Sequence, residues 1–163
     1  MSNWKTLPVL ALLAACASPA PSNPGGTTPG PVMNSGMPGA VSPRLAVEQF
    51  LNAAHAGDLQ AMSAVFGTSK GPARETMSVN DLEKREVILQ CFFDSDTHRI
   101  VGEAAGADGH RIVKAELTKG KVSRQPNFFV VEGPGQRWYV DNMEIAVVRD
   151  FCGQATGTSG LML

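Results

Sequence analysis

Apolar residues recur with a helical period in the segment between Arg44 and Gly67. They fall at i, i+3, i+4 and i+7 in two successive stripes. The stripes are Val47, Phe50, Leu51 and Ala54, followed by Leu59, Met62, Val65 and Phe66. Ser42 and Pro43 are typical of a helix start, Gly57 favours a left-handed stop, and Asp58 is a suitable cap for the next helix. The pattern predicts two short helices joined by a sharp corner.

A third helix is predicted from Val79 to Phe93. It follows a polar, irregular stretch at residues 68–77, and Ser78 to Asp81 resembles a capping box with Asp in the place of Glu. The positions expected to face the core are Leu82, Ile88, Leu89, Phe92 and Phe93.

After Asp96 the apolar period changes from helical to alternating, which indicates strands. The predicted strands are His98–Ala104, His110–Lys119, Val122–Glu132 and Arg137–Val148. Pro126 indicates an edge or a bulge, and a phase shift between Val140 and Met143 indicates a second bulge. Helices followed by an antiparallel meander predict an α+β fold, with three helices packed on a four-stranded antiparallel sheet.

The first fifteen residues have the character of an export signal. Lys5 supplies positive charge, and Leu7 to Ala15 is almost wholly apolar but too short to span a bilayer. The end of this run, Leu13-Ala14-Ala15-Cys16, resembles the lipobox of bacterial lipoproteins. The resemblance implies a diacylglyceryl group on the Cys16 sulfur through a thioether, cleavage before Cys16, and acylation of the new amino terminus. The resulting three lipid chains are more than stable anchoring needs. The alternative is an ordinary secretory signal with a chance cysteine.

Composition divides the rest of the chain. Residues 17–43 hold seven prolines, five glycines and no charge, which is typical of a tether that cannot fold. We therefore expect a signal peptide at 1–15, lipidated Cys16 and the tether at 16–43, a folded domain at 44–152 and a flexible tail at 153–163. The net charge of −1 does not indicate a nucleic-acid partner. The lipobox resemblance implies the lipid bilayer as a partner, through acylated Cys16. Ala17 after the cysteine, where Asp is absent, implies by the same resemblance an outer-membrane protein facing the periplasm.

The stretch AVEQFLNAAHAGDLQAMSAVF, residues 46–66, resembles the first two helices of NTF2-like (SnoaL-like) cone folds. The resemblance implies that the sheet is curved and that a pocket lies between the sheet and the helices. This family usually has a small hairpin between its second and third helices. Only residues 68–77 are available for it here, so the hairpin is expected to be absent or vestigial. A helix layer on a generic antiparallel sheet is the alternative.

Few residues are candidates for chemistry. His55 lies beside an apolar stripe, and Asp94-x-Asp96-x-His98 offers oxygen and imidazole donors that suit a metal but are equally typical of a solvated turn. The other candidates are Trp138 and Tyr139 on opposite strand faces, the carboxylates of Asp141 and Glu144, and a basic hairpin tip of Lys119, Lys121 and Arg124. The sequence contains no nucleophile–base, phosphate-loop or zinc-protease motif. We predict no catalytic residue, no metal and no cofactor, and we assign no ligand-binding residue.

Cys91 and Cys152 are the cysteines that remain after lipidation. An exported protein lies in an oxidising compartment, so a disulfide between them is expected. Such a bridge would close a loop of roughly 60 residues. Two buried, unpaired thiols are the alternative.

Together these features favour a membrane-anchored envelope lipoprotein whose domain binds a small apolar ligand or a protein partner without catalysis. The alternatives are a structural accessory of envelope assembly, and a cone-fold hydrolase, isomerase or dehydratase with His55 or His98 as its base. A binder needs an apolar cavity, an accessory needs an exposed apolar patch, and an enzyme needs an acid or base with a shifted pKa inside a cavity.

Overall fold

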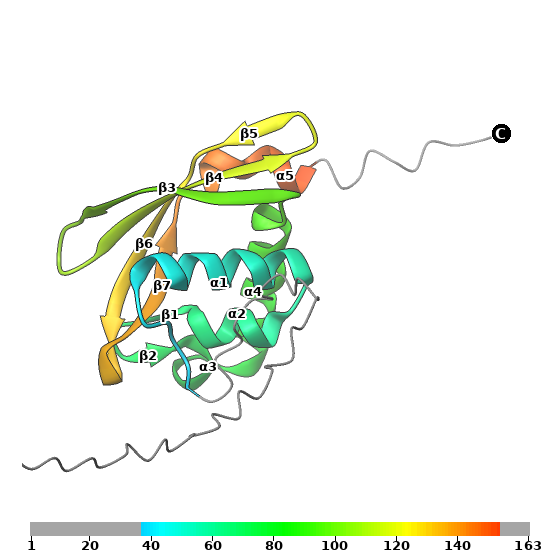
Figure 1. Cartoon of the computed structure of the whole chain (residues 1–163). Coiled ribbons are helices and arrows are strands. Elements are labelled where there is room, and N and C mark those ends of the chain that lie inside the picture. The colour runs from blue at the N-terminus through cyan, green and yellow to red at the C-terminus, as the bar shows by residue number, and fades with distance from the viewer. Residues whose placement is uncertain (1–36, 154–163) are drawn as a thin grey trace, which may run out of the picture. The chain divides into compact units, whose positions relative to one another are not determined.

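The computed structural model describes residues 37–153 and has an α+β fold (Figure 1). Its helices are α1 (Pro43–Ala56), α2 (Leu59–Val65), α3 (Ala73–Thr76), α4 (Val79–Phe93) and α5 (Arg149–Gly153), with short 3-10 turns at Pro134–Gln136 and Ile145–Val148. Its strands are β1 (Gly67–Thr68), β2 (Gly71–Pro72), β3 (Thr97–Ala105), β4 (Arg111–Lys119), β5 (Val122–Arg124), β6 (Asn127–Gly133) and β7 (Arg137–Met143). The predicted signal peptide, lipobox and most of the tether and tail lie outside the described residues.

The predicted helix boundaries at the α1–α2 corner are confirmed. The Ser42 hydroxyl accepts the Leu45 N–H at 3.3 Å, and the Asp58 carboxylate accepts the Ala61 N–H at 2.9 Å. Gly57 has a φ of +67°, the left-handed conformation that ends α1. These local contacts turn the chain sharply, so that α1 lies against β3, β4, β6 and β7 while α2 packs beside it (Figure 1).

Residues 67–76 are more regular than their polar sequence suggests. β1 and β2 pair in a two-residue hairpin, and α3 follows as a single turn. Gly67 is needed here because a Cβ atom would overlap the backbone of Gly71 and Pro72. The hairpin is short because Gly71 has a φ of +124° and Pro72 has no N–H to donate to a ladder.

The main sheet is antiparallel, with the strand order β3-β4-β6-β7 and β5 paired to β4. The predicted third strand is interrupted at Pro126, so that β5 pairs with residues 117–119 and β6 with residues 111–114 of β4. The predicted bulge in β7 is confirmed: Val130 pairs with Val140 and Phe129 with Asn142, which leaves Asp141 as the extra residue.

The prediction that the last strand reaches Val148 is wrong, because β7 ends at Met143. The Glu144 carboxylate accepts the Asn127 N–H at 3.0 Å, and the chain then turns into the 3-10 segment and α5. Val148 and Phe151 are both fully buried. Residues three apart share one side of a helical turn, whereas in a strand they would face opposite sides of the sheet.

Aromatic rings fill the space between α1, α4 and the sheet. The rings of Phe50, Phe93 and Phe128 lie 5.2–6.1 Å apart, centroid to centroid, in tilted and edge-on arrangements. All three side chains are fully buried. The described residues therefore put packed core at this place, where the family resemblance implies a pocket.

The folded unit includes residues before the predicted boundary at Arg44. Ala40 is fully buried and exchanges two backbone hydrogen bonds of 2.9 Å with Trp138 of β7. Gly39 has a φ of +77°, and a Cβ there would lie 2.7 Å from the Tyr139 ring. Residues 38–42 therefore belong to the folded unit. Their composition predicts a tether. It does not reveal their contacts, because the residues that they contact lie about a hundred positions away in the sequence.

No helix within residues 37–153 combines the length and the apolar character needed to cross a membrane.

Candidate functional site

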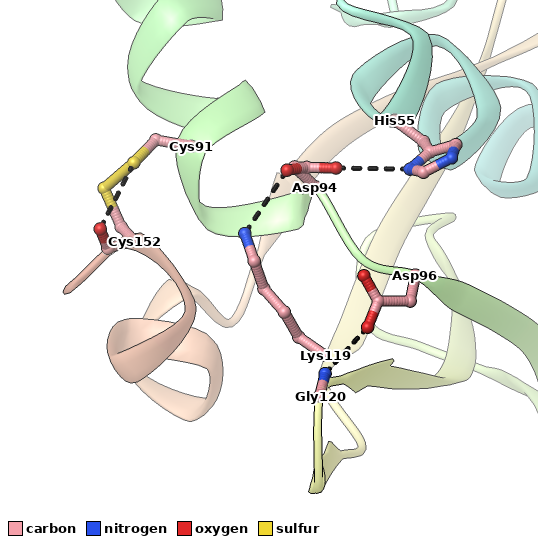
Figure 2. A network of polar contacts seen from close by, with 7 residues as sticks. All are labelled: His55, Cys91, Asp94, Asp96, Lys119, Gly120 and Cys152. Carbon is pink, nitrogen blue, oxygen red and sulfur yellow. Dashed lines mark hydrogen bonds and ion pairs between the residues drawn. A yellow bond between two sulfur atoms is a disulfide. The ribbon is translucent and has the colours of Figure 1, made fainter. Parts of the chain in front are cut away.

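The predicted chemical residues His55 and Asp94 meet at the C-terminal end of α4. The His55 Nδ1 lies 3.2 Å from one Asp94 carboxylate oxygen, and the Lys119 ammonium donates to the other at 3.3 Å (Figure 2). His55 comes from the last turn of α1, and Asp94 is the residue that caps α4. The side chains of His55 and Asp94 are 57% and 42% exposed, so water screens this pair.

Asp96 has a different task from Asp94. Its carboxylate accepts the Gly120 N–H at 2.7 Å, and its own N–H donates to the Thr118 carbonyl at 2.9 Å (Figure 2). Both bonds hold the tip of the β4–β5 hairpin, where Gly120 has a φ of +58°. Within residues 37–153, no group of three or more His, Cys, Asp or Glu side chains is arranged to hold a metal ion.

His98 lies close enough to Glu48 and to His55 of this network for their charges to affect its pKa. Burial lowers the pKa of His98, Glu48 opposes that shift, and His55 adds to it. A neutral imidazole is a reasonable base in principle. However, neither His98 nor His55 lines the groove between α4 and β7 that is described below.

A disulfide joins Cys91 of α4 to Cys152 of α5, with the two Cα atoms 4.9 Å apart (Figure 2). It fixes α5 beside the last turn of α4. Arg124 of β5 donates to the Asp150 carboxylate at 2.7 Å, and this contact links α5 to the sheet. The C-terminal end of α4 is thus held by covalent and polar contacts.

The remaining candidates are dispersed. Tyr139 is buried and its hydroxyl donates to the Pro38 carbonyl at 3.3 Å, with burial as the main cause of its raised pKa. Trp138, on the opposite face, is half-buried. Asp141 pairs with His110, whereas Glu144 caps the N–H of Asn127, so the two carboxylates do not converge. The basic hairpin tip is also divided, since Lys119 and Arg124 have acidic partners of their own.

A groove of about 560 Å³ lies between residues 81–89 of α4 and the end of β7. Its apolar lining consists of Phe66, Met77, Ile88, Leu89, Met143 and Ile145. Its polar lining consists of Asp81, Lys84, Arg85, Asp141 and Asn142. This volume lies within the range of about 300–1,000 Å³ typical of small-molecule sites.

The side of α4 that lines the groove carries both apolar and charged side chains. The predicted core position Ile88 is wrong: its side chain is 55% exposed, and it lines the groove instead. Leu89, one residue on, is buried. The bulge at Asp141 shifts the phase of β7, and Met143 then lies in the groove wall beside Ile145 of the following turn.

Charges in the groove are not equally satisfied. Asp81 accepts a hydrogen bond from the Ser78 hydroxyl at 2.7 Å, and Asp141 lies 2.9 Å from the His110 Nε2. The hydrogen bond to Asp141 raises the pKa of His110. Among residues 37–153, neither Lys84 nor Arg85 has an ion pair or a side-chain hydrogen bond.

Glu86 is the polar residue that the sequence pattern least reveals. It lies in the buried stripe of α4 and is only 3% exposed. One of its carboxylate oxygens has no hydrogen-bond partner among the described residues. Burial raises the pKa of Glu86 to about 7. A glutamate between charged neighbours reads as solvent-facing, and only its i+4 spacing from Leu82 hints otherwise.

Searches against protein-family models, curated proteins and solved structures find no match to this chain. The site is therefore interpreted from its own geometry.

Proposed function

We propose that this protein is a lipid-anchored envelope protein whose folded domain binds a small, mainly apolar ligand in the groove between α4 and β7. The observation that carries the proposal is the groove itself: about 560 Å³ of space with six apolar lining residues and a charged margin. Ligand sites are typically concave and mostly apolar, with a few polar groups that orient the ligand.

The anchoring half of the proposal rests on the amino end of the sequence. Leu13-Ala14-Ala15-Cys16 resembles a lipobox, and a charge-free Pro- and Gly-rich segment follows it. On this basis the acylated Cys16 attaches the domain to a membrane, with the periplasmic side of the outer membrane as the proposed location. Mass spectrometry of envelope protein tests this directly: acyl groups on Cys16 support it, and an unmodified amino terminus at Cys16 contradicts it.

The fold-family proposal remains the NTF2-like cone. It is supported by the helix–Gly57-Asp58–helix corner, by the short β1–β2 hairpin before α4, and by the antiparallel sheet that follows. Within this proposal the ligand site is displaced from the interior of the cone, because Phe50, Phe93 and Phe128 pack there.

A second candidate is a protein partner that docks on the outside of α4. Val79, Val87 and Ile88 are exposed on this helix, with exposed fractions of 78%, 50% and 55%. Exposed apolar side chains that gather on one element are typical of an interaction surface. Of these three residues only Ile88 lines the groove, which allows the two candidates to be separated.

The test uses the mature chain, residues 16–163, with Cys16→Ala and therefore without lipid. A neutral fluorescent probe, N-phenyl-naphthylamine, reports occupancy of an apolar site. We expect saturable binding that Ile88→Lys weakens by at least about tenfold, since an ammonium group in the groove opposes desolvation.

Val87→Lys is the matched control, because Val87 is about as exposed as Ile88 on the same helix but does not line the groove. It is expected to leave probe binding unchanged. Equal losses in both variants would favour the outer face of α4, and no saturable binding by the unmodified domain would contradict the groove proposal.

A further inference from the structure

The charged side chains around the groove are arranged asymmetrically. Both acidic lining residues already have partners, Asp81 with the Ser78 hydroxyl and Asp141 with the His110 imidazole. Both basic lining residues, Lys84 and Arg85, are without a charged or hydrogen-bonding partner in the part of the chain described by the structure. The charged lining side chains that have no partner among the described residues are thus the two cations.

The two cations are placed beside the apolar wall in a regular way. Lys84 and Ile88 are four residues apart on α4, and so are Arg85 and Leu89. Side chains at i and i+4 lie one above the other on the same face of a helix. All four of these side chains line the groove. An apolar chain against Ile88 and Leu89 would therefore have its end one helical turn away, at the two cations.

Resting on the proposed ligand-binding function, we propose that the groove takes a free, single-chain amphiphile with an anionic head, of the fatty carboxylate class. The chain lies against the apolar wall, and the carboxylate accepts charge-assisted hydrogen bonds from Arg85 and Lys84. A guanidinium matches the two oxygens of a carboxylate, and an ammonium adds a point charge beside it.

The charge of the head and the length of the chain make separate contributions. Lys84 and Arg85 are exposed, so water screens each ion pair with the head, and each pair is expected to add about 1.5- to 5-fold in affinity over a neutral head. Each buried methylene contributes about 0.8 kcal/mol, or about fourfold in affinity. Affinity should therefore depend on both the head and the tail of the ligand.

The experiment compares decanoate, decanol and decyltrimethylammonium by displacement of N-phenyl-naphthylamine from the mature chain carrying Cys16→Ala. Decanoate is expected to bind about two- to thirtyfold more tightly than decanol, and the quaternary ammonium ligand more weakly than decanol. Removal of two methylenes, from decanoate to octanoate, is expected to weaken binding by about sixteenfold.

The variant Lys84→Gln with Arg85→Gln removes both cations while keeping exposed, helix-compatible side chains. It is expected to abolish the preference for decanoate, so that decanoate and decanol bind this variant with about equal affinity. Lys114→Gln is the control: it removes one positive charge from an exposed position on β4, outside the groove, and should change neither affinity.

The failures of the two proposals are distinguishable. If decanol binds and decanoate binds no better, or if the double variant keeps the preference for decanoate, the inference about the anionic head is overturned and the groove proposal stands. If neither decanol nor decanoate displaces the probe, both proposals are overturned.

Discussion

The two ends of α4 differ in how their side chains are satisfied. At the C-terminal end, a disulfide ties Cys91 to α5, and Asp94 lies between His55 and Lys119 (Figure 2). Along residues 81–89, the helix lines a groove with apolar walls and two cations that lack partners among the described residues. One end is closed by contacts within the domain, and the other lines the groove that we propose as the binding site.

The residues with catalytic or metal-binding side chains and the proposed binding site therefore lie in different places. His55, Asp94 and Asp96 have the side chains that catalysis and metal binding use, but here they fasten helix ends and a hairpin tip to one another. The groove is lined instead by Ile88, Lys84 and their neighbours, which carry no recognisable motif. Stability is expected to depend on the first region and ligand binding on the second.

The largest effect on stability is expected from removal of the disulfide. In the chain-entropy model, a bridge with a sequence separation of 61 residues stabilises by about 4 kcal/mol. The double variant Cys91→Ser with Cys152→Ser should lose about this amount in urea unfolding, and reduction of the unmodified protein should have a similar effect. Unchanged stability after both treatments would show that the bridge does not constrain the closed end of α4.

Glu86, midway along α4, gives the next effect, and it depends on pH. Its pKa is raised from 4.5 to about 7 in the folded state, so the folded protein binds the proton more tightly than the unfolded chain does. This contribution to stability is complete below pH of about 4.5, and it is lost as the pH rises through about 7. The loss amounts to about 3 kcal/mol.

Glu86→Gln removes this titration, so we expect the stability difference between wild type and variant to change by about 3 kcal/mol between pH 4.5 and pH 8, in favour of the variant at the higher pH. The comparison with the variant is necessary because His98 and His110 titrate in the same window, with pKa shifts of opposite direction. Glu83→Gln, exposed on the same helix, is the control. An identical pH slope in wild type and Glu86→Gln would contradict the assignment.

The smallest effect is expected at the pair that looks most like an active site. His55 and Asp94 are exposed, and pairs of this kind contribute roughly 0.2–1 kcal/mol. His55→Ala should lower the free energy of unfolding by less than about 1 kcal/mol and leave probe binding unchanged. Loss of a measurable turnover or of ligand binding in this variant would instead assign function to the closed end of α4.

Local signals allowed much of the fold to be predicted. Ser42, Gly57, Asp58 and Ser78 act within three or four residues of themselves, so their caps are legible in the sequence. The alternation of Val113, Ala115 and Leu117 depends only on strand geometry, and all three are buried.

Features made by distant segments could not be predicted in this way. The groove is formed by α4 and residues 141–145, which are far apart in the sequence. Ala40 is held by backbone hydrogen bonds to Trp138 of β7, which is also distant in the sequence. The sequence pattern assigned Ile88 to the core, because a helical stripe shows which side is apolar but not where the neighbouring element ends. Ile88 is 55% exposed because it lines the open groove, where no neighbouring element covers it.

The central claim is that ligand binding belongs to the groove lined by residues 81–89 of α4, and backbone amide NMR tests it most directly. On titration of the mature chain carrying Cys16→Ala with decanol, we expect saturable shifts at residues 77–89 and 141–145, with little change at His55, Asp94 and Lys119. Shifts centred on His55 and Asp94, or shifts that never saturate, would contradict the account.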